Sequence, residues 1–400
     1  MGAKTAHILI AGGGIGGMAA ALSLLQRGFD VDIYEQADAF REVGAGVQIS
    51  PNGNRALNTL GVFEALKALS CNADGKEIRL WNTGQTWKLF DLGHEAVERY
   101  GFPYLTVFRP DLLQVLVDAV TALKPDALHL GARVAGCAQS DDTVTLTLEN
   151  GTRVSGDALI GADGVHSRIR HALWGESKAQ FSGMMAWRGV IPMERLPQHM
   201  TRPVATNWVG PGAHVVCYPL RGGQLMNFVA TVERSDWLTE SWNAEGTLAE
   251  CKADFAGWHS DIQAMIENAP SLFKWALMGR PPMSAWTRGR ATLLGDACHP
   301  TLPFLAQGAV MALEDAVVLG RSLEAHRDNI PEALLRYEAA RLDVTARKVM
   351  GAAANTERFH NPALATEAGA QAYVDQEWSR AAILNRYEWL FTYDVNAVTV

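Results

Sequence analysis

A run of glycines close to the N-terminus constrains the fold of this chain more than any other feature. Residues 7–11 (His-Ile-Leu-Ile-Ala) have the length and apolar character of a buried strand. The segment Gly-Gly-Gly-Ile-Gly-Gly follows at 12–17, and residues 18–26 are rich in Ala and Leu, as expected of a helix. Gly28 marks the end of that helix, and residues 31–35 read as a second strand. This order predicts a strand–turn–helix–strand unit at the start of an α/β fold.

The glycine spacing matches the turn that binds a dinucleotide. Gly12, Gly14 and Gly17 fit the pattern GxGxxG, in which glycine permits a tight turn, close approach of a pyrophosphate and close helix–strand packing. The helix N-terminus would direct free N–H groups and its positive dipole end at the phosphates. Glu35, at the end of the second strand, is placed to accept hydrogen bonds from a ribose diol and disfavours a 2′-phosphate. The unit alone leaves three alternatives open, namely FAD, NAD or a glycine turn without a ligand.

Composition narrows the class of partner. The formal net charge of −8 argues against nucleic acid, whose phosphates require a basic surface. The five cysteines are scattered and form no CxxC pair, which indicates reduced thiols in a cytosolic protein and no metal site. The sequence has no stretch of about twenty apolar residues, and the apolar N-terminal segment lacks the marks of a signal peptide. We therefore expect a soluble, cytoplasmic protein without a membrane span.

Two later segments favour a flavin. Residues 157–164 read as a buried strand that ends in an Asp-Gly turn, and residues 291–300 read as another that ends in Gly295-Asp296. Asp296 at a strand end is suited to a ribitol hydroxyl. A helix is expected from about Gly308 to Leu319, and its N-terminus would stabilise the negative charge of a reduced flavin at its N1–C2=O edge.

These three segments together resemble the fingerprints of class A flavoprotein aromatic monooxygenases, a family that includes salicylate, 3-hydroxybenzoate and 6-hydroxynicotinate hydroxylases. The matching residues are the glycine turn with Glu35, the Gly161-Ala162-Asp163-Gly164 segment, and Gly295-Asp296 followed by His299-Pro300. The resemblance implies bound FAD in a Rossmann-type domain of the p-hydroxybenzoate-hydroxylase fold, with a β-sheet substrate domain and a C-terminal helical segment. It also implies NADH or NADPH as a transient co-substrate, O₂, and a homodimer as the family expectation.

The resemblance assigns cofactor contacts residue by residue. Arg109 matches the arginine of an Arg-x-Asp-Leu motif beside the FAD, although a surface ion pair is the alternative for it. Asp163 matches an aspartate associated with both nucleotides, although it could simply cap its turn. The full set of expected FAD-binding residues is Gly12, Gly14, Ile15, Gly16, Gly17, Glu35, Gln36, Arg41, Val47, Arg109, Val134, Asp163, Asp296, Gly308 and Ala309.

The same resemblance predicts how the chain is divided into domains. The FAD-binding domain would comprise residues 1–75, 100–180 and 285–350, and the substrate domain residues 76–99 and 181–284. Helical periodicity is expected from Pro331 to about Met350. Residues 351–400 are polar but carry many aromatic side chains, which indicates a docking or dimerisation segment rather than a disordered tail.

The expected reacting site lies in the strand-like segment 213–220. His214 and Tyr218 are four residues apart, so a strand places both side chains on one face, and the family places such a pair over the flavin. We predict that His214 and Tyr218 act on the substrate, with a buried structural histidine as the alternative. Gln48 and Phe304 complete the expected substrate contacts, although Phe304 could equally be core packing.

Three other residues carry weaker expectations. Gln48 stands where 6-hydroxynicotinate hydroxylases carry a histidine, which puts hydroxypyridine chemistry in doubt because glutamine is not a base. His299 belongs to a turn and is expected to be structural. Arg188 could meet a carboxylate.

The resulting hypothesis is hydroxylation of a small phenolic aromatic acid, salicylate- or hydroxybenzoate-like, with NAD(P)H and O₂ through a flavin C4a-hydroperoxide. Three alternatives stay open: a hydroxypyridine carboxylate hydroxylase, a flavin oxidoreductase that inserts no oxygen, and a non-catalytic dinucleotide-binding regulator.

Overall fold

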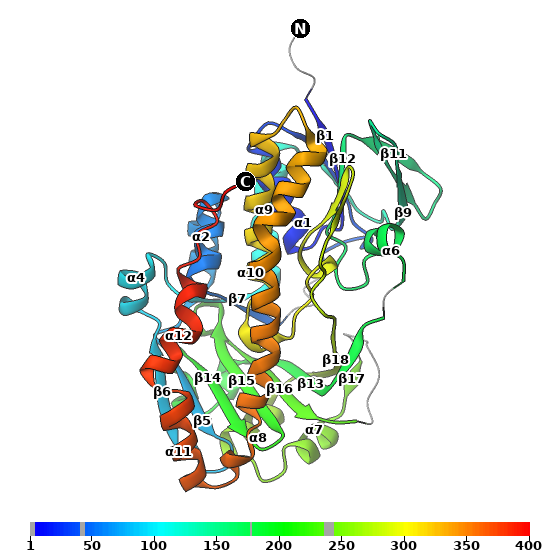
Figure 1. The fold of residues 1–400 in the computed structure, drawn as a ribbon. Coiled ribbons are helices and arrows are strands. Elements are labelled where there is room, and N and C mark those ends of the chain that lie inside the picture. The colour runs from blue at the N-terminus through cyan, green and yellow to red at the C-terminus, as the bar shows by residue number, and fades with distance from the viewer. Residues whose placement is uncertain (1–4, 41–44, 177, 236–243) are drawn as a thin grey trace.

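The computed structural model describes residues 5–40, 45–176, 178–235 and 244–400, and it places a parallel sheet at one end of the molecule (Figure 1). The strand order is β19-β20-β12-β1-β2-β8, in which all neighbours are parallel except β19 and β20. The strands are β1 (His7–Ala11), β2 (Asp30–Tyr34), β8 (Leu128–His129), β12 (Ala158–Gly161), β19 (Thr287–Arg288) and β20 (Ala291–Leu293). The predicted first strand, helix and second strand are therefore adjacent in space, and the predicted α/β class is confirmed.

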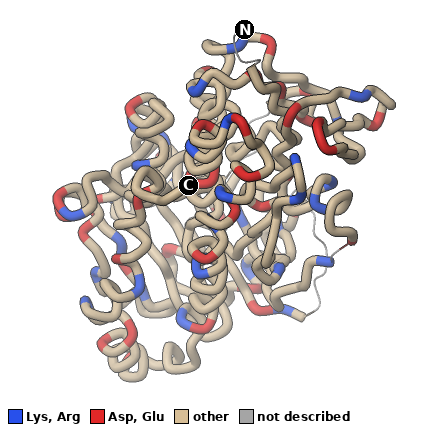
Figure 2. Tube along the Cα trace, turned by 45° about the horizontal axis from the view of Figure 1, so that its top comes forward, with Lys and Arg blue, Asp and Glu red and all other residues tan. Residues whose placement is uncertain are grey.

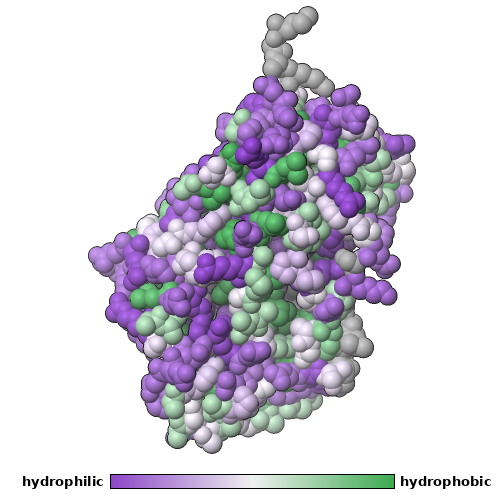
Figure 3. Space-filling model, in the orientation of Figure 1, coloured by the Kyte–Doolittle hydropathy of each residue, from purple (hydrophilic) through white to green (hydrophobic). Residues whose placement is uncertain are grey.

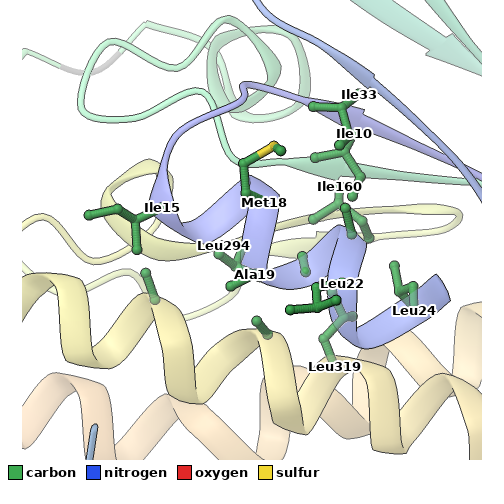
Figure 4. Close-up of a cluster of buried hydrophobic side chains, with 14 of the residues drawn as sticks. Ile10, Ile15, Met18, Ala19, Leu22, Leu24, Ile33, Ile160, Leu294 and Leu319 are labelled. Atoms are coloured by element: carbon green, nitrogen blue, oxygen red, sulfur yellow. The ribbon is translucent and has the colours of Figure 1, made fainter. Parts of the chain in front are cut away.

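The first helix, α1 (Ile15–Leu25), packs between this sheet and α9 (Gly308–Ala325). Its small and aliphatic residues are almost fully buried, so the helix is apolar nearly all round, as expected for a helix inside a layered fold. Figure 4 shows Met18, Ala19 and Leu22 of α1 close to Leu294 and Leu319, beside the strand residues Ile10, Ile33 and Ile160. This contact fixes the glycine turn relative to the start of α9.

Shorter elements surround the parallel sheet. The helices α5 (Arg109–Leu123) and α3 (Phe63–Leu69) pack against each other, and α5 also packs on α1. An antiparallel sheet, in the order β11-β10-β9, lies beside α6 (Arg168–Trp174). Another has the order β3-β7-β4 and lies beside α2 (Pro51–Thr59). The strands of these two sheets are β9 (Val134–Gln139), β10 (Val144–Leu148), β11 (Arg153–Gly156), β3 (Gly46–Ile49), β7 (Leu105–Phe108) and β4 (Cys71–Asn72).

A large mixed sheet, which we call the substrate sheet, forms the other end of the molecule (Figure 1). Its order is β17-β18-β13-β16-β15-β14-β5-β6, so the segment predicted as a hairpin at 76–99 supplies one edge, followed by helix α4 (His94–Tyr100). The strands are β5 (Gly75–Leu80), β6 (Thr86–Asp91), β13 (Gln180–Pro192), β14 (Val204–Gly210), β15 (Ala213–Leu220), β16 (Leu225–Glu233), β17 (Glu245–Gly246) and β18 (Leu272–Gly279).

The two faces of the substrate sheet have different neighbours. On one face, Trp187, Trp208 and Phe228 form a core with residues of α7 (Leu248–Asp254) and α8 (Ser260–Asn268). The other face meets the half of the molecule that contains the parallel sheet, because the amide of Gly46 on β3 donates to Asn227 Oδ1 on β16 at 2.7 Å. His214 and Tyr218 lie in register with Thr231 and Asn227, so they share this second face.

The C-terminal part is helical. α10 (Ile330–Phe359) runs from the parallel sheet to the substrate sheet and extends beyond the end predicted near Met350 (Figure 1). α11 (Glu367–Glu377) and α12 (Arg380–Phe391) follow. Trp378 packs in a cluster with residues of the substrate sheet, whereas Phe391 packs with Tyr104 and Leu92. The aromatic residues of the tail thus cover apolar surface of the chain itself.

A buried ionic network joins α9 to α10. Glu314 on α9 accepts bonds from Arg341 at 2.7 Å and Lys348 at 2.6 Å, and both cations belong to α10. Asp315 accepts from Arg341 at 2.7 Å and bonds His299 at 2.6 Å. All of these side chains are at most 1% exposed. The cations hold the pKa of Asp315 low, at about 2, against the opposing effect of burial.

Charged residues of both signs are spread over the chain. Figure 2 shows basic and acidic positions interspersed along the trace, and Figure 3 shows hydrophilic residues over most of the visible face with apolar residues scattered among them. Within the described residues, no helix has the length and apolarity that a membrane crossing needs.

The ionic network makes a testable contribution to stability. Replacing Arg341 with Met would leave two buried carboxylates without their shared cation, so we expect a loss of about 3–5 kcal/mol in the free energy of unfolding. Denaturant unfolding of the purified protein measures this loss. The matched control is Arg336→Met on the same helix, because Arg336 is 54% exposed and pairs with Glu332 at the surface. We expect that control to change stability by less than about 1 kcal/mol, and equal losses in both variants would contradict the interpretation.

Candidate active site

The glycine turn has the geometry that a bound diphosphate requires. Gly12 has φ +102°, and a Cβ there would lie 2.4 Å from the carbonyl oxygen of Ala162. A Cβ on Gly17 would lie 1.9 Å from the carbonyl oxygen of Gly12. A Cβ on Gly14, in contrast, would meet no atom within 4 Å. Gly12 and Gly17 are therefore needed for the fold, whereas Gly14 keeps a space open in front of α1.

That space belongs to a crevice of about 760 Å³ at the carboxyl ends of β1, β2 and β12. Seven of the predicted cofactor residues line it: Gly12, Gly14, Glu35, Gln36, Arg109, Val134 and Asp163. Basic side chains that the sequence did not single out complete its wall: Arg133, His166, Arg168, Arg170, His171 and Arg280. A concave, mainly basic site beside a helix N-terminus suits a ligand with two phosphates.

The two acidic residues of the crevice are held by backbone amides. Glu35 accepts from the N–H groups of Gly13 at 2.6 Å and Ala37 at 2.8 Å. Asp163 accepts from the Ser167 hydroxyl at 2.5 Å and from the N–H of Arg168 at 2.6 Å. Asp163 thus caps α6 and also lines the crevice. A structural cap and a place at the nucleotide site, the two alternatives left open for it by the sequence, are therefore compatible. Burial raises its pKa despite these hydrogen bonds.

Arg109 stands where the crevice, the end of β20 and the substrate sheet meet. It lines the crevice, and its charge acts on both Asp296 and Arg188, whose pKa values it lowers. Neither Arg109 nor Asp296 makes a side-chain hydrogen bond within the described residues, although both are accessible to solvent. Burial raises the pKa of Asp296 on balance. These are unused donor and acceptor groups in a deep position, as a ligand site requires.

The start of α9 lies against Asp296. A Cβ on Gly308 would be 4.0 Å from Asp296 Oδ1, so Gly308 and Ala309 bring the helix N-terminus to the strand end. The preceding loop carries Phe304 and also Ala306, which adopts the left-handed conformation with φ +55°. A strained residue in this place is typical of a loop whose shape serves a ligand.

The substrate-sheet face opposite this loop carries His214 and Tyr218. His214 is 1% exposed, and its ring lies 4.9 Å from the Phe304 ring, centroid to centroid. Burial, together with the charge of His360, lowers its pKa well below the ordinary value, so His214 is neutral at pH 7. Tyr218 lies within hydrogen-bonding reach of Gln48, and Gln48 also accepts from the Tyr104 hydroxyl at 3.0 Å. Burial raises the Tyr218 pKa, so its phenol stays protonated.

Several polar atoms on this face are buried without a partner in the described part of the chain. They are Asn207 Oδ1 on β14, and Asn227 Nδ2 and Thr231 Oγ1 on β16. An unpaired buried polar atom costs about 1–3 kcal/mol, so native sites that contain several such atoms usually bind a ligand or ordered water. No sequence pattern singles out these residues, because each occupies an ordinary position of a strand.

Lys76 on β5 was also missed by sequence reasoning. It lies in register with Ala205, which packs with Tyr218, so it belongs to the same face. Burial lowers its pKa to about 8, and no carboxylate or hydrogen-bond acceptor pairs with its ammonium group within the described residues. Because Lys76 stands between Gly75 and Glu77, the sequence predicts an exposed strand residue at this position.

The other predicted residues have varied places. Ile15, Gly16 and Gly17 form the first turn of α1, and Val47 lies on β3 in register with Val107. Arg41 lies outside the described residues. His299 is fully buried against Asp315, the structural place expected for it.

Comparison with known proteins agrees with this geometry. The model of the FAD binding domain family matches residues 5–352. A 3-amino-4-hydroxybenzoate 2-monooxygenase of Streptomyces platensis is 36% identical over 392 residues, which cover 98% of this chain and 97% of that protein. A 6-hydroxynicotinate 3-monooxygenase of Pseudomonas fluorescens is 37% identical over 347 residues, which cover 85% of this chain and 88% of that protein. The chain belongs to the FAD-dependent aromatic monooxygenases.

A solved structure supports the fold of this monooxygenase and its cofactor. A variant of HpxO from Klebsiella pneumoniae, complexed with FAD, superposes with a TM-score of 0.83 at 28% identity and covers 96% of this chain and 98% of that chain. The predicted p-hydroxybenzoate-hydroxylase type of fold and the predicted FAD are confirmed. The residues present fit FAD, because the open space at Gly14, the basic crevice and the unpaired Asp296 supply partners for its phosphates and hydroxyls.

The role of Gly14 can be tested without disturbing the fold. Gly14→Val places a branched side chain in the open space before α1, so the apoprotein should fold while FAD affinity falls at least about 100-fold. Titration of the apoprotein with FAD, followed by flavin fluorescence, measures the affinity. The matched control is Gly136→Val on β9, because a Cβ at Gly136 also meets no atom within 4 Å. If both variants bound FAD like the parent protein, the crevice would not be the diphosphate site.

Proposed function

We propose that this monooxygenase hydroxylates a small phenolic aromatic acid of the salicylate or hydroxybenzoate type, with NAD(P)H and O₂ as co-substrates. The observation that carries the proposal is a buried, neutral His214 on the face of the substrate sheet that meets the FAD-binding half. When bound, FAD transfers the electrons of NAD(P)H to O₂ and supplies the electrophilic oxygen. The ring must then act as the nucleophile, which a phenolate does better than a phenol.

His214 is suited to remove the hydroxyl proton of the substrate. Its Nδ1 bonds His360 at 2.7 Å, whereas Nε2 has no hydrogen-bond partner in the described part of the chain. A neutral imidazole with one unused nitrogen accepts a proton from a hydroxyl placed within hydrogen-bonding reach. Tyr218, with its phenol protonated, would position the same hydroxyl by a hydrogen bond. Phe304 closes the site on the side of α9 and helps to exclude water.

Lys76 would bind the substrate carboxylate. An ammonium group in apolar surroundings gains most from a carboxylate, because neither group is then well solvated by water. Asn207, whose amide oxygen is unpaired within the described residues, lies on the neighbouring strand β14 in register with Ile78 of β5. That oxygen can accept from a hydroxyl but not bind a carboxylate, so the preference for an aromatic acid over a neutral phenol rests on Lys76.

The names of the relatives point to two classes of aromatic ring as the substrate, benzene and pyridine. The Streptomyces protein is named for a hydroxybenzoate and the Pseudomonas protein for a hydroxynicotinate. Gln48 is hydrogen-bonded to Tyr104 and provides no base. This absence of a base at Gln48 favours the benzene ring. A hydroxypyridine carboxylate hydroxylase is the second candidate, and a flavin oxidoreductase that inserts no oxygen is the third.

A substrate panel tests the function. We expect salicylate or a hydroxybenzoate to accelerate NADH or NADPH oxidation by the FAD-loaded enzyme at least tenfold, and the product to carry one ¹⁸O atom after reaction under ¹⁸O₂. Acceleration by hydroxypyridine carboxylates alone would transfer the assignment to the second candidate. Product without ¹⁸O would transfer it to the third.

The base is tested by His214→Asn. We expect kcat to fall about 10²–10⁴-fold at pH 7, because asparagine keeps a polar side chain but cannot accept the proton. Stopped-flow measurement of flavin reduction and of product formation separates this step from FAD binding. A loss of less than threefold would assign His214 to packing.

The carboxylate contact predicts a pH dependence. Lys76 is cationic below its pKa of about 8 and neutral above it, so KM for the acid should rise as pH increases beyond 8. Lys76→Met should raise KM at least tenfold at pH 7 and remove the preference for the acid over its amide. Lys88→Met is the matched control, because Lys88 on β6 is 71% exposed. Unchanged KM in Lys76→Met would place the carboxylate elsewhere.

A further inference from the structure

A chain of hydrogen bonds leads from His214 to the surface. His214 Nδ1 lies 2.7 Å from Nε2 of His360, at the end of α10. His360 Nδ1 lies 2.8 Å from Oε1 of Glu233, at the end of β16. The side chains of His214 and His360 are buried, whereas that of Glu233 is 54% exposed. The chain therefore joins the substrate-facing histidine to solvent through one intermediate ring.

The surface carboxylate fixes which nitrogen of each ring carries hydrogen. An ionised Glu233 can only accept, so His360 Nδ1 must donate to it. In neutral His360 the other nitrogen, Nε2, is then an acceptor, and His214 Nδ1 must donate to it. Neutral His214 is thereby left with its lone pair on Nε2, the nitrogen without a partner. The arrangement sets His214 as a proton acceptor before any substrate binds.

Within the described residues, the only charged groups that act on the pair of rings are the members of the chain itself. The elements packed against His214 present Val209 of β14, Thr231 of β16, Phe304, and Phe359 of α10. His360 is the charge-bearing group that acts on His214, and Glu233 is the one that acts on His360. Burial lowers the pKa of both rings, which favours the neutral imidazole with a single N–H in each. A lowered pKa makes His214 a weak base on its own, so removal of a phenol proton requires that the proton pass on to a further acceptor.

We infer that His214, His360 and Glu233 form a relay that carries the hydroxyl proton of the substrate from the active site to solvent. The inference rests on the proposed function, since it requires a substrate with an acidic hydroxyl. The O–H bond of the substrate breaks and its proton forms an N–H bond at His214 Nε2. His214 Nδ1–H passes to His360 Nε2, and His360 Nδ1–H passes to Glu233 and then to water. The phenolate keeps the electron pair, and the reverse shift restores both rings.

His360 is a positioning and relay residue in this account, because it touches His214 and not the substrate. A merely structural role would predict a change in stability or binding without a change in proton transfer. The test therefore follows the proton itself. The probe is 3-hydroxy-4-nitrobenzoate, whose phenolate absorbs visible light, mixed with the FAD-loaded full-length enzyme in a stopped-flow instrument.

We expect His360→Gln to slow ionisation of the bound probe at least tenfold, with its Kd and the FAD content changed less than threefold. Gln can accept from His214 but cannot pass a proton on. The matched control is His199→Gln, because His199 bonds Asp261 at 2.8 Å at the surface, another His–carboxylate pair, and should behave like the parent enzyme. Ionisation at the parental rate in His360→Gln would overturn the relay.

A second measurement separates the relay from the substrate assignment. In the ligand-free enzyme, ¹⁵N NMR of the histidine rings, assigned with His214→Asn, should show hydrogen on Nδ1 of His214 and none on Nε2. His360→Gln should mix the two tautomers. If no phenolic acid binds but this tautomer is found, the proposed substrate fails and the relay stands. Hydrogen on Nε2 of His214 would overturn the relay whatever the substrate is.

Discussion

Two carboxylates inside the molecule depend on cations that come from another helix. Glu314 and Asp315 would not remain ionised in an apolar core by themselves, and Arg341, Lys348 and His299 supply their counter-charges. Each bond has a fixed length and direction, so α9 can take few positions along α10. Since the first turn of α9 lies against Asp296, the network also fixes where the helix dipole points. The cofactor site therefore depends on charges that never touch the cofactor.

The candidate functional groups divide between the two halves of the molecule according to the chemistry proposed for them. The parallel sheet ends in a basic crevice for phosphates, held open by glycine and lined by arginine. The substrate sheet contributes neutral or weakly basic groups, His214, Tyr218 and Lys76, in apolar surroundings. Arg109 lies between the two environments. The charged diphosphate of the cofactor can thus bind in a polar crevice while the reaction site on the substrate sheet excludes water.

Much of the fold could be predicted because its signals are local. The glycine turn, the strand before it and Glu35 lie within thirty-five residues of the N-terminus, and each type of residue has a geometric reason to be there. Asp163 and Asp296 follow buried strands, so their place at the edge of the sheet follows from parallel pairing. His214 and Tyr218 could be placed on one face by the strand period alone. The end of α10 was placed too early, since the helical periodicity was followed only to about Met350 whereas the helix continues to Phe359.

The rest could not be predicted because it depends on pairings between distant segments. His360 and His214 are 146 residues apart, and nothing in either neighbourhood indicates the other. Lys76 appears to be an exposed strand residue until β5 is placed beside β14 and helices cover that face. The partnerless Asn207 and Thr231 were invisible for the same reason, since an unsatisfied atom is a property of packing. These are also the residues on which substrate choice should depend.

The length of α10 has a mechanical consequence. Its early residues Leu334 and Tyr337 belong to the core around the parallel sheet, whereas Phe359 belongs to the cluster on the substrate sheet. At 1.5 Å per residue its 30 residues make a strut of about 45 Å, and its one proline, Pro331, lies in the first turn, where it does not kink the helix. A hinge between the two halves would have to bend this strut. A stiff α10 would hold the spacing between the crevice and His214 constant, and would leave entry and exit of small molecules to smaller movements at the rim of the site.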